Sequence, residues 1–139
     1  MDELLPAISE AAAVIGDRWS PAVIAALLDG PLRYGELQQR IEGIAPNILS
    51  ARLKRLEEHG LVVSSPYSER PPRYEYRLTE AGAELSDLLA LLAAWGSRRR
   101  SDVHGPVHAA CGTPLEVTWW CPTCQESASP DGEDDSVSV

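Results

Sequence analysis

The sequence lacks several features that would place it in a membrane or outside the cell. No apolar run approaches the roughly 20 residues of a membrane-spanning helix. The opening MDELLP holds two acids and no basic residue, which is unlike a signal peptide. Cysteine is scarce, and an odd count of three leaves one thiol over in any disulfide framework. We therefore expect a soluble, cytoplasmic protein without membrane contact, whose thiols serve a purpose other than crosslinking.

Basic residues are missing from one part of the chain. The net charge of −9 and the pI near 4.7 argue at first against binding to nucleic acid. However, residues 102–139 contain seven acids and no Lys or Arg, whereas the stretch from Arg33 to Arg77 holds eight basic residues against six acidic ones. The whole-chain charge thus averages a mildly basic middle and an acidic tail, and the middle remains suited to DNA.

Motifs of catalysis are also absent. The sequence has no glycine loop for nucleotide phosphates, no G-x-S-x-G elbow and no carboxylate–histidine set. We therefore expect that the protein is not an enzyme.

What the sequence does contain is a succession of short helices. Periodicity predicts helices over 7–15, from Ser20 to Asp29, over 34–41, and from Pro46 to Gly60. The Ser20 hydroxyl is expected to cap the second helix. In the fourth, Leu49, Leu53 and Leu56 form a core stripe, and the opposite face is polar.

Two strands and a last helix follow. Residues 61–65 and 73–79 have strand character and are joined by a predicted loop over 66–72. Thr79 is expected to cap a long helix over about 80–98, whose apolar face is too extensive for a lone surface helix and should pack on a partner. The predicted fold is mainly α with a small β hairpin (α+β), a winged helix-turn-helix.

This order of elements suits double-stranded DNA. A helix 10–12 Å across fits the major groove, and its N-terminal end attracts phosphate. The hairpin loop would place arginines beside neighbouring phosphates or the minor groove. The candidate DNA-binding residues are Arg33, Asn47, Ser50, Ala51, Arg52, Lys54, Arg55, Arg70 and Arg73.

A family resemblance rests on specific segments. These are Gly16-Asp17-Arg18-Trp19, Asn47-Ile48-Leu49-Ser50 with Arg52-Leu53, Pro71-Pro72-Arg73-Tyr74-Glu75-Tyr76, and Trp95-Gly96. Over residues 6 to about 96 the chain resembles the HxlR-type transcriptional regulators, bacterial winged-helix proteins close to the MarR group. The resemblance implies a homodimer, joined through the first and last helices, that binds a roughly palindromic operator, and we expect a repressor. The expected interface residues are Ile8, Leu85, Leu88, Leu89, Leu92 and Trp95. Trp19 and Trp95 are expected to pack in the core or the dimer interface, and a pocket lined by them for a small-molecule effector of unknown identity is the alternative.

The chain departs from the family pattern at four positions. Leu5 replaces the cysteine that several members use as a redox sensor, so thiol sensing there is excluded. Ala45 replaces a capping serine, which should lower the stability of the fourth helix by about 1 kcal/mol unless its backbone is held in another way. Asn47 and Ala51 stand where Lys and Gln are common, so a different operator is expected.

The tail adds a possible metal site. His108 and Cys111 form one x2-spaced pair, Cys121 and Cys124 form another, and 115–120 has strand character between them. This arrangement predicts a small zinc ribbon with a structural zinc held by His108, Cys111, Cys121 and Cys124, with His104 as a reserve ligand.

Other interpretations of the tail remain open. The cysteines could be unmetallated thiols, Cys121 and Cys124 could be a redox pair, or the cluster could be the input of a metal- or redox-responsive regulator. A winged-helix module that binds protein instead of DNA is a further alternative. The expected organisation is a winged domain over 1–101, the ribbon-like extension over 102–125, and an acidic disordered tail over 126–139.

Overall fold

A computed structural model describes residues 1–130 and divides the chain into two compact units. The first unit spans Leu4–Leu89, and the second consists of Met1–Glu3 with the chain from Ala90 onward. Residues 131–139, part of the predicted acidic tail, lie outside the described residues. Among the described residues, no helix has both the length and the apolar character needed to cross a membrane.

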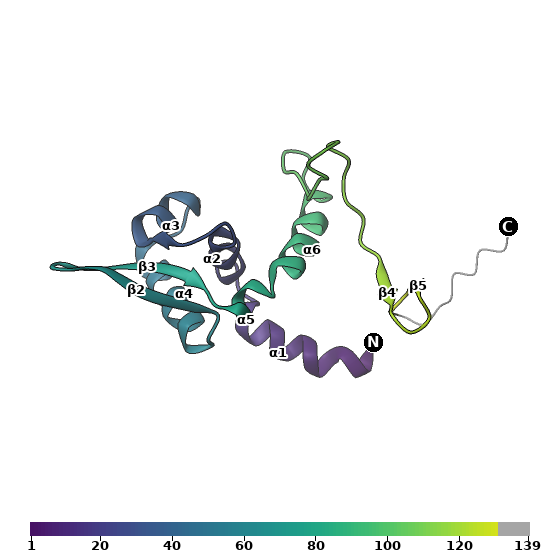
Figure 1. The fold of residues 1–139 in the computed structure, drawn as a ribbon, viewed down its shortest axis with the longest axis horizontal. Coiled ribbons are helices and arrows are strands. Elements are labelled where there is room, and N and C mark those ends of the chain that lie inside the picture. The colour runs from purple at the N-terminus through teal and green to yellow at the C-terminus, as the bar shows by residue number, and fades with distance from the viewer. Residues whose placement is uncertain (131–139) are drawn as a thin grey trace. The chain divides into compact units, whose positions relative to one another are not determined.

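The first unit combines helices with a small antiparallel sheet (Figure 1). After a short 3-10 turn, Asp2–Leu4, the helices of the chain are α1 (Leu5–Ile15), α2 (Ser20–Leu27), α3 (Tyr34–Arg40), α4 (Pro46–Glu58), α5 (Glu80–Ala83) and α6 (Ser86–Ser97). The second unit includes the part of α6 from Ala90 onward. The strands β1 (Leu32–Arg33), β2 (Val62–Glu69) and β3 (Pro72–Leu78) pair in the order β1-β3-β2. The predicted α+β fold with a winged helix-turn-helix is confirmed.

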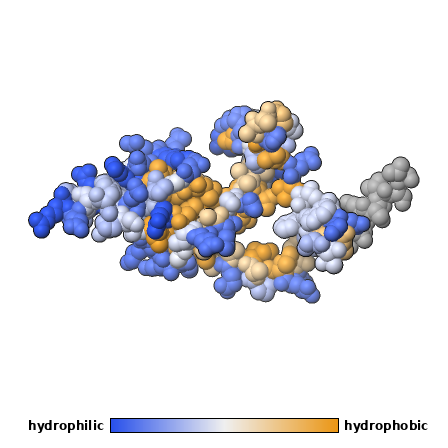
Figure 2. Space-filling view, viewed as in Figure 1, coloured by the Kyte–Doolittle hydropathy of each residue, from blue (hydrophilic) through white to orange (hydrophobic). Residues whose placement is uncertain are grey.

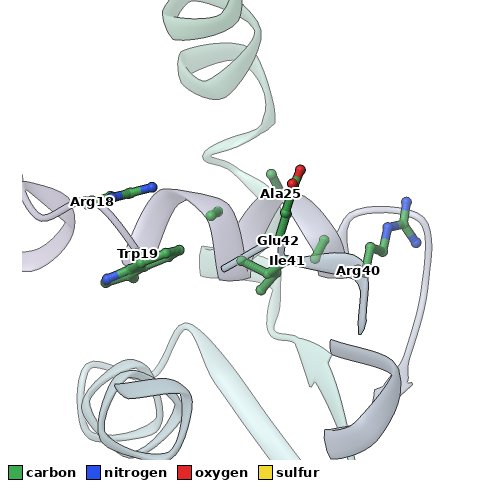
Figure 3. A pocket seen from close by; sticks show the side chains of 8 residues that line it. Arg18, Trp19, Ala25, Arg40, Ile41 and Glu42 are labelled. Carbon is green, nitrogen blue, oxygen red and sulfur yellow. The ribbon is translucent and has the colours of Figure 1, made fainter. Parts of the chain in front are cut away.

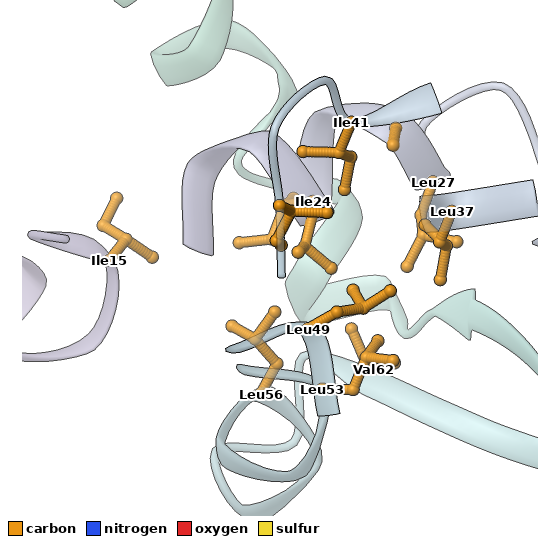
Figure 4. Close-up of a cluster of buried hydrophobic side chains, with 12 residues drawn as sticks. Ile15, Ile24, Leu27, Leu37, Ile41, Leu49, Leu53, Leu56 and Val62 are labelled. Atoms are coloured by element: carbon orange, nitrogen blue, oxygen red, sulfur yellow. The ribbon is translucent and has the colours of Figure 1, made fainter. Parts of the chain in front are cut away.

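The hydrophobic core lies between α2, α3, α4 and the start of β2 (Figure 4). The predicted stripe of α4 is central to it, since Leu49, Leu53 and Leu56 are at most 2% exposed. They meet Ile24 of α2 and Leu37 of α3, both fully buried. Because the stripe occupies one side of α4, the opposite side is left facing solvent.

The cap of α2 differs from the prediction. Ser20 lies inside the helix, and it is Asp17 that accepts the backbone N–H groups of Trp19 and Ser20, at 2.9 and 3.0 Å. The Ser20 hydroxyl donates to the other oxygen of Asp17. A carboxylate three residues before the first turn can reach these free amides, so the serine is not needed as the acceptor.

The wing is longer than predicted. Residues 66–69, expected to be loop, continue β2, with Ser68 opposite Arg73 and Glu69 opposite Pro72. A register shift between Pro66 and Ser68 accommodates the proline, which cannot donate to the ladder. The short strand β1 was not predicted, because two residues are too few to show a period.

The last helix is interrupted, contrary to the prediction of one helix over 80–98. Thr79 does cap its start, since its hydroxyl accepts the N–H of Gly82. Gly82 lies so close to Leu61, the residue before β2, that an added Cβ would be 2.2 Å from the Leu61 carbonyl oxygen. The Leu85 N–H then bonds to the Gly82 carbonyl in an i→i−3 turn, which separates α5 from α6.

The second unit contains little regular structure beyond the end of α6. Its strands are β4 (Trp119–Cys121) and β5 (Glu126–Ala128), which form a two-stranded hairpin. The predicted strand over 115–120 is therefore mostly wrong, because only its last two residues pair, and they pair forward with 127–128. β5 also occupies a place predicted to be disordered.

Candidate nucleic-acid interface

The exposed face of α4 carries most of the predicted base-contacting residues. Asn47, Ser50, Ala51 and Lys54 are all exposed and lie opposite the buried leucine stripe. Their spacing places them along one side of the helix, over its first two turns. This side offers an amide, a hydroxyl, a methyl group and an ammonium, which are groups that contact base edges and phosphates.

The N-terminal end of α4 is fixed by α3. As expected from Ala45, no side chain caps this end. Instead, the Tyr34 hydroxyl donates to the Pro46 carbonyl at 2.6 Å and lies 3.1 Å from the Ser50 hydroxyl. Tyr34 thereby links the first residue of α4, Pro46, and the residue one turn later, Ser50, to α3, so the helix end is held without a cap.

Arg52, a predicted DNA contact, forms an internal ion pair. Its Nε donates to Asp17 Oδ1 at 2.8 Å, and both side chains are about one-quarter exposed, at 25% and 24%. Burial alone would raise the pKa of Asp17, but hydrogen bonds from Ser20, the Trp19 and Ser20 amides and Arg52 hold it well below its usual range. The family segment Gly16-Asp17-Arg18-Trp19 thus connects α4 to the start of α2.

Arg55 is also engaged within the chain. Its guanidinium donates to the carbonyl oxygen of Ala13 near the end of α1. Within the described part of the chain, Lys54 is therefore the basic residue predicted on α4 whose charged group lies on the exposed face without such an internal bond. Sequence periodicity could separate the faces of α4, but it could not show which arginines bond to other helices.

The wing brings cationic and aromatic side chains together. Arg70 lies at the turn between β2 and β3, whose far end is hydrophilic (Figure 2), and Arg73 is exposed on β3. The Arg33 guanidinium stacks on Tyr67, 4.2 Å from the ring centre. A pocket of about 340 Å³ beside it is lined by Arg33, Tyr34, Gly35, Tyr67, Pro72, Arg73, Tyr74 and Tyr76. All four tyrosines of the chain line it, which sequence spacing did not indicate.

A second pocket, of about 480 Å³, lies against α2 (Figure 3). One wall is formed by Arg18, Trp19 and the small side chains of Ala22, Ala25 and Ala26. The Arg18 guanidinium lies 4.5 Å from the centre of the Trp19 ring. Arg40, Ile41 and Glu42 complete the lining. Trp95, the other residue considered for an effector site, is not part of it.

The residues predicted at a dimer interface fall into two groups. Leu85 and Leu89 pack partly against the core of the first unit. In contrast, Leu88, Leu92 and Trp95 of α6 are exposed, at 36%, 45% and 57%, and Ile8 of α1 is 51% exposed. Apolar side chains along α1 are visible in Figure 2. Each helix therefore presents apolar surface that the single chain leaves in water.

The predicted metal ligands form two separate pairs. His108 Nδ1 lies 3.3 Å from Cys111 Sγ, and Cys121 and Cys124 lie at the turn between β4 and β5. A hydrogen bond with the Thr113 hydroxyl lowers the pKa of Cys111, and the Cys124 amide lowers that of Cys121. Within residues 1–130, no three His, Cys, Asp or Glu side chains are gathered as a metal site. His104 lines a different hollow, beside Ala94 and Ser97.

Known proteins share both the sequence and the fold of the first unit, Leu4–Leu89, which we call the winged unit. The HxlR-like helix-turn-helix family matches residues 14–103. An HTH-type transcriptional regulator of Mycobacterium tuberculosis is 35% identical over 123 residues, covering 86% of this chain and 77% of the relative. A MarR-family transcriptional regulator from Porphyromonas gingivalis matches with a TM-score of 0.63 and 30% identity, over 67% and 91% of the two chains. The reduced form of the transcriptional regulator YodB from B. subtilis matches with a TM-score of 0.58 and 33% identity, over 67% and 91%.

These likenesses agree with the geometry of α4 and the wing. The matched relatives are regulators of transcription, and the polar face of α4 is suited to the groove of DNA. The chain therefore belongs to the HxlR-like helix-turn-helix family and is a DNA-binding transcriptional regulator, not an enzyme.

Proposed function

We propose that the protein binds a roughly palindromic operator as a two-fold dimer, with α4 in the major groove, and that it represses transcription by occupying that site. The observation that carries the proposal is the division of α4 into a buried leucine stripe and an exposed face with Asn47, Ser50, Ala51 and Lys54. A helix held on one side by the core can offer the other side to base edges without losing stability.

The wing extends this contact to the DNA backbone. Arg70 and Arg73 are exposed at and beside the hairpin turn, where they can meet phosphates flanking the groove. Arg33 is also exposed, and its stacking on Tyr67 limits its freedom, so less side-chain entropy is lost when it binds phosphate.

Arg52 and Arg55 have a different role in this proposal. Because Arg52 bonds to Asp17 and Arg55 bonds to Ala13, they act as positioning residues that fix the orientation of α4. Lys54 then supplies the direct phosphate contact from this helix. Loss of Arg52 is expected to weaken binding through the fold, whereas loss of Lys54 removes one ionic contact per subunit.

The exposed apolar side chains of α1 and α6 support dimerisation. Leu88, Leu92 and Trp95 lie on α6 at helical spacing, and Ile8 lies on α1. Burial of such side chains contributes about 25 cal/mol per Å² removed from water. A second copy of the chain offers the same apolar helices, as a two-fold contact requires. Two copies would then present two α4 helices to successive half-sites.

Salt dependence of DNA binding tests the interface. An operator is first selected from a random duplex pool with the purified protein, and its affinity is then measured by fluorescence anisotropy at several salt concentrations. Lys54→Ala should weaken binding about 10-fold and lower the log–log salt slope by about 0.9 for each subunit's lost contact. Arg98→Ala, which removes an exposed charge after α6, is the matched control and should change neither quantity. Binding that is independent of salt would contradict the proposal.

Dimerisation is tested separately by Leu92→Glu. Leu92 is 45% exposed, so the monomer should fold normally while the charge prevents close contact between copies. Sedimentation at micromolar concentration should show a dimer for the wild type and a monomer for the variant, with operator affinity reduced at least about 10-fold. Glu84→Lys, also an exposed change just before α6, is the control for charge alone. A monomeric wild type that binds the operator fully would exclude the dimer.

A further inference from the structure

The tail beyond the family match contains two turns with the same backbone geometry. In the first, the N–H of Gly112 donates to the His108 carbonyl at 2.7 Å, and Gly112 has φ +73°. In the second, the N–H of Gln125 donates to the Cys121 carbonyl at 2.8 Å, and Gln125 has φ +56°. Each turn thus spans a potential ligand, two residues and a cysteine, followed by a left-handed residue.

A left-handed residue at this place is informative because it is unusual for glutamine. Among the described residues, Gln125 is the one residue other than glycine with positive φ. This conformation is unfavourable for most side chains and persists where the surroundings require it. Its recurrence directly after Cys111 and directly after Cys124 indicates that both turns are shaped for a common purpose.

Each turn closes a short antiparallel hairpin. The first hairpin has a bridge between Val107 and Pro114, and the Leu115 N–H donates to the Pro106 carbonyl at 3.0 Å. The second is the β4–β5 hairpin (Figure 1), in which Cys121 is opposite Glu126. The potential ligands therefore lie at the tips of two hairpins of similar construction.

The side chains of the first turn lie close together, and Cys111 Sγ also donates a hydrogen bond to the Thr113 hydroxyl at 3.2 Å. His108 Nδ1 and Cys111 Sγ are 3.3 Å apart, close to the roughly 3.5 Å between neighbouring ligand atoms of a tetrahedral zinc site.

The chain around these turns has no core. Leu115, Val117, Trp119 and Trp120 are between 51% and 62% exposed, although apolar side chains of this size are usually covered. Residues 115–118, between the hairpins, have no regular secondary structure, so they can bend to bring the two tips together. An additional source of folding energy is needed to cover these side chains, and a metal ion can supply it.

We propose that the two hairpin tips close on one structural zinc ion, held by His108 and Cys111 from the first and by Cys121 and Cys124 from the second. One nitrogen and three sulfurs form a common zinc ligand set, and four protein ligands leave no open position for catalysis. The site lies outside the family match, which ends at residue 103. The likeness to the Mycobacterium tuberculosis regulator covers 86% of the chain, too much to fit within 1–103.

Cobalt spectroscopy of the full-length, reduced protein tests the site directly. After chelator treatment, titration with Co²⁺ should saturate at one ion per chain and give the charge-transfer and d–d absorption of a tetrahedral thiolate site. Zn²⁺ should abolish these bands by displacing Co²⁺. Metal analysis of protein prepared without chelator should find one zinc per chain. The absence of the bands, or saturation at one ion per two chains, would overturn the proposal.

Variants determine whether both hairpins hold the same ion. Cys111→Ser and Cys121→Ser should each weaken Co²⁺ binding at least about 100-fold, since even outer partners of metal ligands account for 10–100-fold. Circular dichroism should show that the winged unit stays helical. If Cys111→Ser leaves the affinity unchanged, the two-hairpin site is excluded. His104→Ala should have no effect, and a loss of affinity with His104→Ala but not with His108→Ala would overturn the ligand assignment.

Gln125 provides a test that does not alter any ligand. Gln125→Gly should retain full Co²⁺ affinity because glycine adopts positive φ readily, whereas Gln125→Val should weaken it about 10-fold because a β-branched residue does not. Equal affinities for the two variants would show that the turn geometry does not contribute to metal binding, and the argument from matched turns would fail.

Discussion

The winged unit and the chain from Ala90 onward, here called the tail, differ in the interactions that stabilise them. The winged unit, Leu4–Leu89, encloses twelve buried apolar side chains, whereas no residue from Ala90 to the end of the described chain is buried. In the winged unit, side chains far apart in sequence are held by packing, as in the contact of α2 with α4. In the tail, the hydrogen bonds of the two turns and their hairpins join residues at most nine positions apart.

This difference determines what each region can do. A packed unit can hold an exposed helix face in a fixed orientation, which recognition of a DNA groove requires. A segment without a core can only fix local turns, and it needs an added ligand or partner to order them relative to one another. Function on α4 therefore depends on distant packing, and function in the tail depends on short-range geometry.

The largest test of this comparison is a leucine-to-alanine exchange in each region. Leu53→Ala should lower the free energy of unfolding by about 3–4 kcal/mol, because it removes buried methyl groups and leaves a cavity in the centre of the core. Leu115→Ala, in metal-free protein, should change it by less than about 0.5 kcal/mol, because Leu115 is 51% exposed. Urea denaturation followed by helical circular dichroism, at one fixed protein concentration, measures both. Similar losses for the two variants would show that the tail has a core of its own.

The sequence predicted the winged unit well because its signal is periodic. The stripe Leu49, Leu53 and Leu56 fixed the buried face of α4, and the glycines and prolines marked most helix ends. The predictions of secondary structure failed where a tertiary contact overrides the local conformational preference. The close approach of Gly82 to the Leu61 carbonyl depends on residues that are distant in sequence. The pairing of residues 66–69 with β3 was missed because the prolines in this stretch hide the alternating pattern of a strand.

The candidate sites were predicted less completely, for the same reason. Sequence spacing placed Arg52 on α4, but only the fold shows that its partner is Asp17, 35 positions earlier. The gathering of all four tyrosines beside the wing likewise requires that α3 and two strands come together. In the tail, the spacing of the two ligand pairs could be read directly, whereas the left-handed conformation of Gln125 could not.

An intermediate effect is expected from removing the ion pair that links the helices. Asp17→Ala should lower the free energy of unfolding by about 2–3 kcal/mol, since it removes the acceptor of two free amides and leaves Arg52 unpaired. Asp102→Ala is the matched control in the tail. Its ion pair with Arg100 joins residues two positions apart, and the side chains of Asp102 and Arg100 are 63% and 68% exposed, so no measurable change in unfolding free energy is expected. A substantial loss with Asp102→Ala would contradict the view that the tail lacks stabilising long-range contacts.

The smallest expected effect is the pH dependence of the contribution that Asp17 makes to the free energy of unfolding. Because the pKa of Asp17 is lowered in the folded state, the unfolded chain binds the proton first as the pH falls. The contribution of Asp17 is therefore complete above about pH 5, where an unfolded aspartate is also ionised, and it declines at lower pH as the pH approaches the folded pKa. The difference in unfolding free energy between the wild type and Asp17→Asn should stay constant from pH 7 to about 5 and then narrow toward pH 3, measured by urea denaturation. Asp102→Asn should differ little from the wild type across this range, because its exposed charge is screened by solvent and salt. A wild-type advantage over Asp17→Asn that persists undiminished at pH 3 would locate the effect in packing or hydrogen-bond geometry, and the charge of Asp17 would then not be what joins α4 to α2.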